Sequence, residues 1–243
     1  MLPLHLHLDK SPGLGHQRRL LAIYQEWIRR GGKTERFVNR RAKGPAVHLF
    51  DGYLFTTDDW TAANKAGGLV VCIAEKILVY PVDLVFIPCL INPQDKIQTE
   101  CTDYFIGPQY FPLRDSFKQI PVKADDEQPV QVDEVFYCDA VNRSMHPNTF
   151  TYHMAQAKVI VCSSGITAYE SLYLGKPTLL RLSADNQKSN FFNLVSGKYA
   201  LPFRDVNPVS LEYDVRKRLS GAGRSLVDGY GSERIVDEIL RRL

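Results

Sequence analysis

The chain has 243 residues, of which 44% are hydrophobic, 11% aromatic and 23% charged. This composition is typical of a globular protein with one large domain or two small ones. The formal net charge of +3, from 30 Lys and Arg against 27 Asp and Glu, is too small to indicate a nucleic-acid-binding protein by itself, because such proteins usually carry a strong basic stripe.

Strands and helices alternate in the first half of the chain. Leu4–Leu8 alternates along a strand, and His16–Arg30 has the apolar spacing of a helix that ends at Gly31-Gly32. A second helix is expected from Thr57 or Asp58 to Gly67. Four more strands are predicted, at 46–50, 69–74, 83–91 and 104–108. The continuous apolar runs at 69–74 and 83–91 are typical of a parallel sheet that is buried on both faces.

The second half repeats this alternation. Residues 118–129 contain two prolines, several charges and no periodicity, so we predict an N-terminal lobe over 1–118, a linker over 119–129 and a C-terminal lobe over 130–243. The predicted strands of the C-terminal lobe are 135–138, 158–164 and 177–183. Its predicted helices are 146–157, 165–175, 185–196, 208–219 and 232–243. The fold class is therefore α/β, with two Rossmann-like lobes built on parallel sheets.

The cysteines indicate a reducing compartment. All five (Cys72, Cys89, Cys101, Cys138 and Cys162) are widely spaced, and no C-x-x-C pair occurs. We expect reduced thiols in a cytoplasmic protein. No signal peptide is evident, and no apolar run approaches the roughly 20 residues of a membrane-spanning helix, which predicts a soluble protein.

The first candidate motif follows the first strand. Gly13 and Gly15 permit close approach of a ligand to the backbone, and His16 lies in the first turn of the next helix. A neutral imidazole at this edge of a parallel sheet is suited to act as a general base. The same residues also fit an ordinary turn and helix start, and the third glycine of the dinucleotide-binding fingerprint is absent.

The second candidate motif is "SSGITAYE". A buried strand ends in Ser163-Ser164-Gly165, and a helix begins there with Thr167 in its first turn. Small residues at a helix N-terminus suit a phosphate or diphosphate. Glu170, one turn later, is placed to accept hydrogen bonds from a ribose diol. Simple helix capping by the serines is the alternative.

A third polar group follows the next strand. Asp185, Asn186 and Gln187 carry donors and acceptors that suit the hydroxyl groups of a sugar, and Asp185 equally suits a helix cap. By itself this group does not distinguish a sugar-binding site from a helix cap.

Taken together, the motifs resemble those of glycosyltransferase-B-type (GT-B) proteins. The resemblance is closest to the UDP-sugar hydrolase of pseudaminic acid biosynthesis and more distant to the N-acetylglucosaminyltransferase that makes lipid II. "GLGHQRR" resembles the hydrolase's G-x-G-H-x-x-R, and "DGYLFTTDDW" its Asp-His-Tyr stretch, with Gly52 in place of the histidine. "FIGPQYFPLRDSF" is similar to the segment between its lobes, and "LVDGYGSERIVDEI" to its closing helix. "SSGITAYESLYLGKPTLL" with "ADNQ" matches the donor-binding strand–helix pairs of both families.

The chain departs from the family pattern in three places. The stretch between Arg30 and Asp51 is short, and the second lobe lacks its usual opening strand between Phe117 and Val135. "IAEKILVYPVD" replaces a stretch that begins with Asp-Asp in the hydrolase. These differences weaken the inference that the same sugar, or hydrolysis itself, is retained.

The resemblance implies a two-lobed GT-B fold with a central cleft and a nucleotide sugar, expected to be a UDP-sugar, as substrate. His16 is the implied catalytic base, with Tyr53 and Asp51 beside it. Ser163, Ser164, Gly165 and Thr167 are assigned to the diphosphate, Glu170 to the ribose, and Asn186 and Gln187 to the sugar. The remaining implied binding residues are Gly13, Gly15 and Arg19. The resemblance implies no metal or other cofactor, and attack opposite the diphosphate inverts the anomeric centre.

The sequence does not identify the nucleophile. Water makes the protein a UDP-sugar hydrolase, and a hydroxyl group on another molecule makes it a glycosyltransferase, which we favour slightly. The basic run "ERFVNRRAK" suits a large anionic acceptor, and DNA with a hydroxymethylated base is one candidate. Its phosphate-contacting residues are predicted to be Arg36, Arg40, Arg41 and Lys43. A third alternative is a binding subunit without catalytic activity.

Overall fold

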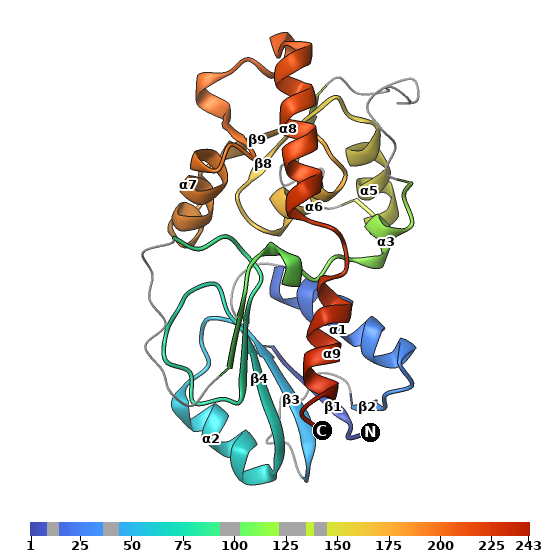
Figure 1. The fold of residues 1–243 in the computed structure, drawn as a ribbon, viewed down its shortest axis with the longest axis vertical. Coiled ribbons are helices and arrows are strands. Elements are labelled where there is room, and N and C mark those ends of the chain that lie inside the picture. Colours follow the sequence, from blue (N-terminus) through green and yellow to red (C-terminus); the bar gives the residue numbers. More distant parts are fainter. Residues whose placement is uncertain (9–14, 36–43, 93–102, 122–134, 139–144) are drawn as a thin grey trace. The chain divides into compact units, whose positions relative to one another are not determined.

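The computed structural model describes residues 1–8, 15–35, 44–92, 103–121, 135–138 and 145–243. It divides into two compact units, which are described separately below. The first unit contains Met1–Arg114 together with Tyr230–Leu243, and the second contains Asp115–Gly229 (Figure 1).

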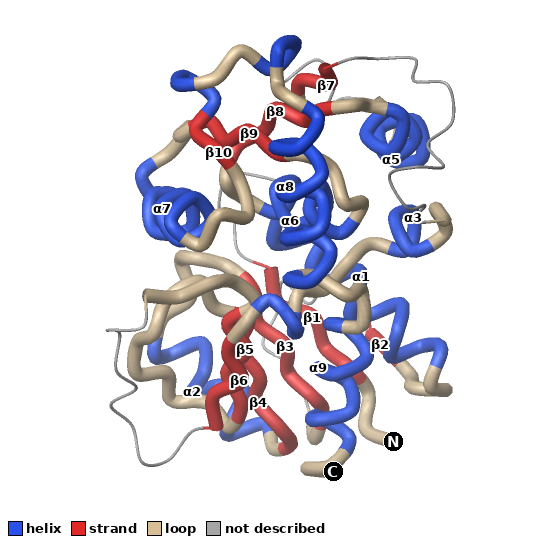
Figure 2. The backbone as a smooth tube through the Cα atoms, turned by 45° about the horizontal axis from the view of Figure 1, so that its top comes forward, coloured by secondary structure: helices blue, strands red, loops and turns tan. Residues whose placement is uncertain are grey.

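The first unit is built on a parallel six-stranded sheet with the order β2-β1-β3-β4-β5-β6. Figure 2 shows these strands in red, side by side. The strands are β1 (Leu4–Leu8), β2 (Thr34–Glu35), β3 (Ala46–Asp51), β4 (Gly68–Ile73), β5 (Leu84–Ile87) and β6 (Asp103–Ile106). The helices are α1 (Gly15–Arg29), α2 (Thr57–Ala66) and α9 (Gly231–Leu240), with a 3-10 turn, η1, at Pro108–Tyr110.

Helices cover both faces of this sheet. One face packs against Trp27 and its neighbours on α1 and against Ile235 and its neighbours on α9. The opposite face packs around Phe50 and Val70, with Ala63 of α2. Burial on both faces explains why β4 and β5 are continuous apolar runs, as the sequence predicted.

The last helix belongs to the first unit. The predicted C-terminal lobe extended to residue 243, but α9 packs against α1 in the core described above. Arg30 pairs with Asp237 at 3.0 Å, and Arg234 donates a hydrogen bond to the carbonyl of Gln109 at 2.7 Å. A Cβ atom at residue 231 would lie 2.1 Å from the carbonyl oxygen of Phe111, so this approach requires glycine. These contacts join residues far apart in sequence, which local patterns do not reveal.

The second unit contains a parallel four-stranded sheet with the order β10-β9-β8-β7. Its strands are β7 (Val135–Tyr137), β8 (Val159–Ser163), β9 (Thr178–Arg181) and β10 (Leu201–Pro202). Its α-helices are α3 (Asp115–Lys118), α5 (Pro147–Gln156), α6 (Ile166–Tyr173), α7 (Lys188–Ser196) and α8 (Tyr213–Leu226). Its 3-10 turns are η3 (Asp185–Gln187), η4 (Phe203–Asp205) and η5 (Pro208–Ser210).

Two helices of the second unit differ from the prediction, since the predicted helix over 185–196 begins as η3 before α7. The sequence predicted a helix over 208–219, whereas the chain forms η5 and then α8 as far as Leu226. Glycine is a poor helix former, yet Gly221 and Gly223 lie inside α8. A Cβ atom at Gly223 would lie 3.1 Å from the backbone of Leu172, so close packing against α6 explains why glycine is used inside this helix. Most of the predicted linker, residues 122–129, lies outside the described residues.

Three histidines of the first unit share one face of the sheet. His5 and His7 alternate with leucines on β1, and His48 lies beside them on β3. His7 Nε2 lies 3.2 Å from His48 Nδ1, and the His7 ring stacks on Phe50 at 4.1 Å. Burial, followed by the neighbouring imidazoles, lowers the pKa of His7 to about 3 and that of His48 to about 4. Both rings are therefore neutral in the folded protein at neutral and mildly acidic pH.

This pair predicts a loss of stability in mild acid. Unfolded histidine takes up a proton near pH 6.5, whereas the folded rings resist protonation, so the free energy of unfolding falls as pH decreases below 6.5. Between pH 7 and pH 5 the loss is about 2 kcal/mol for each histidine. Urea unfolding at fixed pH values measures it. The variant His48→Gln should show a shallower pH slope over this interval, and an unchanged slope would contradict the assignment.

Candidate active site

His16 lies in the first turn of α1, after the carboxyl end of β1. Gly15 is the first residue of the helix, and Gly13 lies outside the described residues. The carboxyl ends of parallel strands form the edge where α/β sheets bind ligands. The predicted position of His16 at this edge is therefore confirmed.

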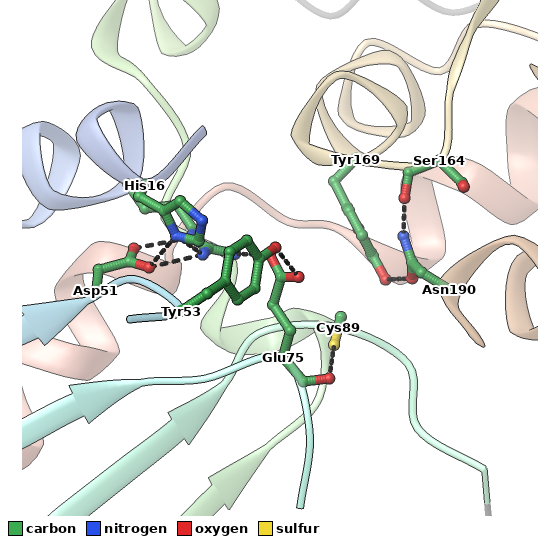
Figure 3. A network of polar contacts seen from close by, with 9 residues as sticks. His16, Asp51, Tyr53, Glu75, Cys89, Ser164, Tyr169 and Asn190 are labelled. Carbon is green, nitrogen blue, oxygen red and sulfur yellow. Dashed lines mark hydrogen bonds and ion pairs between the residues drawn. The ribbon is translucent and has the colours of Figure 1, made fainter. Parts of the chain in front are cut away.

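A buried carboxylate organises this edge. Asp51, the last residue of β3, has no exposed surface, and its Oδ1 lies 2.6 Å from His16 Nδ1. Arg19, one turn after His16, donates to both oxygens of Asp51, from Nε at 2.8 Å and from Nη2 at 2.7 Å. Figure 3 shows His16 and Asp51 turned toward each other. A bidentate guanidinium fixes the orientation of the carboxylate as well as its charge.

These contacts determine which nitrogen of His16 carries the proton. Arg19 Nη2 also lies 2.8 Å from His16 Nδ1, but this nitrogen already donates to Asp51 Oδ1 at 2.7 Å. The carboxylate oxygen of Asp51 at 2.6 Å requires a hydrogen on Nδ1. The neutral ring is therefore the Nδ1–H tautomer, which leaves the lone pair of Nε2 to accept a proton from a substrate.

Tyr53 and Glu75 complete the cluster in the first unit. The Tyr53 ring packs edge-on against the His16 ring, with centroids 4.4 Å apart, and its hydroxyl donates to Glu75 Oε2. Arg19 Nη1 donates to Glu75 Oε1 at 2.9 Å. Glu75 follows β4, the strand next to β3. Sequence reasoning missed Glu75; the available signal was a lone acidic residue directly after a buried strand.

The charges of the cluster compensate one another. Burial opposes ionisation of Glu75, but Arg19 and the Tyr53 hydroxyl together hold the pKa of this carboxyl below its ordinary value. Arg19 stays protonated because Asp51 and Glu75 raise its pKa despite its burial. Burial, with Asp51 nearby, raises the pKa of the Cys72 thiol to about 12, so this thiol is not a nucleophile at neutral pH.

The second unit presents a helix N-terminus at the end of β8. Gly165 is the N-cap of α6 and makes no side-chain capping hydrogen bond. Asn190 braces the segment, because it donates to the carbonyl of Ser164 and accepts from the Tyr169 hydroxyl, both at 2.5 Å (Figure 3). The first backbone N–H groups of a helix have no partner within the helix, so this rigid turn suits an anion.

The other predicted residues of this unit lie around the same turn. Ser164 is buried, and its hydroxyl donates to the carbonyl of Gln187 at 3.1 Å, so it braces the turn. Thr167 and Glu170 are buried on α6. Gln187 Nε2 lies 3.4 Å from where a Cβ atom of residue 165 would be, and its Oε1 is buried without a hydrogen-bond partner among the described residues. The structure thus brings together Gly165 and Gln187, which the sequence assigned to diphosphate and sugar.

The remaining predicted site residues are exposed, partly exposed or outside the described part of the chain. Asn186 is exposed in η3, and Ser163, the last residue of β8, is partly exposed. Arg36, Arg40, Arg41 and Lys43 lie outside the described residues. Within the described part of the chain, no group of three or more His, Cys, Asp or Glu side chains is arranged to hold a metal ion.

Solved structures with the same fold are GT-B glycosyltransferases and UDP-GlcNAc 2-epimerases. MurG of Acinetobacter baumannii is 11% identical, with a TM-score of 0.60, over 98% of this chain and 99% of that one. The glycosyltransferase of kitacinnamycin is 15% identical, with a TM-score of 0.62, over 99% of both chains. A UDP-N-acetylglucosamine 2-epimerase is 15% identical, with a TM-score of 0.56, over 99% of this chain and 96% of that one.

These likenesses establish the fold. It is the α/β fold of GT-B glycosyltransferases, with two parallel sheets, as the sequence predicted. No protein-family model matches the sequence. No curated protein matches it either. Among the described helices, none is both long and apolar enough to cross a membrane.

The Asp51 cluster predicts a large loss of stability when its centre is removed. Asp51→Ala leaves the buried Arg19 guanidinium with Glu75 alone, and breaking a buried pair on one side typically costs about 3–5 kcal/mol. Urea unfolding of the variant measures this cost. Glu238→Ala is the control, because it removes an exposed pair with Arg241, worth less than about 1 kcal/mol. Equal effects of the two substitutions would contradict the role assigned to Asp51.

Proposed function

We propose that the protein is an inverting glycosyltransferase that uses a nucleotide sugar, expected to be a UDP-sugar, without a metal ion. The observation that carries the proposal is the buried Asp51–His16 pair, which leaves Nε2 of His16 as a proton acceptor. The solved structures of the same fold support the choice of substrate, since they include glycosyltransferases and a co-structure of Staphylococcus aureus MnaA with UDP.

In this proposal His16 activates the nucleophile. Nε2 takes the proton of an acceptor hydroxyl group while the oxygen forms a bond to the anomeric carbon of the sugar. The bond from that carbon to the diphosphate breaks, and the nucleoside diphosphate leaves with the electron pair. Attack opposite the leaving group inverts the anomeric centre. Asp51 stabilises the imidazolium that forms, and Tyr53 packs against its ring.

The second unit supplies the donor site in this proposal. The N-terminus of α6 carries the positive end of the helix dipole, which stabilises the negative charge that develops on the departing diphosphate. Ser163, Gly165 and Thr167 would contact the diphosphate. Glu170 would hold the ribose, and Asn186 and Gln187 the sugar. The uncapped turn at Gly165 and the unpaired Oε1 of Gln187 support this assignment.

A panel of UDP-sugars tests the reaction, with UDP release measured with and without acceptors. DNA carrying a hydroxymethylated base is included because of the predicted role of Arg36, Arg40, Arg41 and Lys43. Release that requires an acceptor supports transfer. Release without an acceptor indicates hydrolysis with water as nucleophile, and binding without release indicates a non-catalytic subunit. EDTA should leave the rate unchanged, and a rate restored only by a divalent cation would contradict metal independence.

His16→Ala should abolish UDP release and leave donor binding unchanged, since His16 acts on the nucleophile. Loss of a general base lowers the rate by about 10²–10⁴-fold. Steady-state rates and calorimetric binding of the donor measure the two effects. His146→Gln, at an exposed histidine of the second unit, is the control. Unchanged release in His16→Ala would exclude the proposed base.

Gly165→Ala should weaken nucleotide binding without unfolding the protein. The added methyl group would meet Gln187 Nε2 at 3.4 Å, which is ordinary contact, but it would occupy the approach to the helix N-terminus. We expect UDP to bind at least about tenfold more weakly, a loss of about 1.4 kcal/mol. Gly221→Ala is the matched control, because a Cβ atom there meets nothing within 4 Å. Equal affinity of the two variants for UDP would exclude the α6 N-terminus as the diphosphate site.

A further inference from the structure

An arginine of the second unit packs against two aromatic rings at the carboxyl edge of the sheet. Arg181 is the last residue of β9 and is exposed. Its guanidinium carbon lies 4.3 Å from the centre of the Phe203 ring and 5.3 Å from that of Tyr137. Such cation–π contacts fix the position of a side chain that is otherwise free to move.

Strand order places this guanidinium over the end of β8. Tyr137 ends β7 and Arg181 ends β9, and β8 lies between these strands. Neighbouring strands are about 4.8 Å apart, so the contact between Arg181 on β9 and the Tyr137 ring on β7 spans β8. The residue of β8 paired with Arg181 is Ser163, on the same side of the sheet. The guanidinium therefore lies beside the strand end that leads into the uncapped turn at Gly165.

The charge of Arg181 is not neutralised by the described part of the chain. No carboxylate among the described residues forms an ion pair with it, in contrast to Arg204 nearby, which pairs with Asp205 at 3.5 Å. The two rings also contact each other, with centroids 6.2 Å apart and nearly perpendicular planes, so they border the guanidinium on adjacent sides and do not enclose it. A planar set of donors matches a phosphate or carboxylate with two hydrogen bonds.

We propose that Arg181 is a phosphate-binding residue of the donor site and contacts the diphosphate of the nucleotide from the side of the sheet that carries Ser163. This inference rests on the proposed function. In this inference Arg181 adds a permanent positive charge near the helix N-terminus, and Phe203 and Tyr137 hold that charge in place. No sequence motif indicated Arg181, because its two aromatic partners come from β7 and η4, which are separate from β9 in the sequence.

The test compares three ligands that differ in their phosphates: uridine, UMP and UDP. Arg181→Ala should weaken calorimetric binding of UMP and UDP by about 10–100-fold, as expected for a lost hydrogen bond between charged groups, and leave uridine binding unchanged. Arg181→Lys keeps the charge without the planar donors and should give an intermediate loss. The matched control is Arg204→Ala, which removes an exposed arginine next to Phe203 and should change none of the three affinities.

The outcomes separate this inference from the proposed function. If the wild-type protein binds UDP and Arg181→Ala binds it equally well, the role of Arg181 is wrong and the donor site stands. If Arg181→Ala weakens uridine as much as UDP, Arg181 does not act through the phosphates. If the wild-type protein binds none of the three ligands, the proposed function fails, and this inference fails with it.

Discussion

The first unit depends on one buried carboxylate. Asp51 has no contact with solvent, yet it ends β3 at the edge where a ligand is expected to bind. Two groups from the first turns of α1 satisfy it, the guanidinium of Arg19 and the imidazole of His16. A buried carboxylate needs such partners because its desolvation is costly. The same contacts fix the tautomer of His16, so the requirement for stability and the requirement for a proton acceptor are met by one interaction.

In the second unit the candidate binding groups are backbone N–H groups, whereas in the first unit they are side chains. Its β8 ends in a turn braced by Asn190 and Ser164, which leaves the N–H groups at the start of α6 for a ligand. Both arrangements follow from parallel sheets, because the carboxyl ends of all strands lie at one edge and the next helix begins there. Polar residues placed directly after buried strands therefore gather without any motif that spans the intervening sequence.

The sequence predicted the helices and strands that local residue patterns encode. Continuous apolar runs indicated β4 and β5, and the alternation of Leu4–Leu8 and the apolar spacing of 16–30 indicated β1 and α1. Glu75 was missed because a single acidic residue after a strand has no distinctive pattern; its role appears only in its contacts with Arg19 and Tyr53. The packing of α9 in the first unit was missed for the same reason, since it depends on contacts between α1 and a helix about 200 positions later in the sequence.

The central claim is that Asp51 holds the neutral His16 ring with its proton on Nδ1 and leaves Nε2 free. Nitrogen-15 NMR of protein labelled at histidine measures this directly, with His16→Gln used to assign the signals. For the neutral ring the structure predicts a protonated Nδ1 and an unprotonated Nε2. In Asp51→Asn, if it folds, this preference should be lost. A His16 ring with its proton on Nε2 in the wild-type protein would contradict the account.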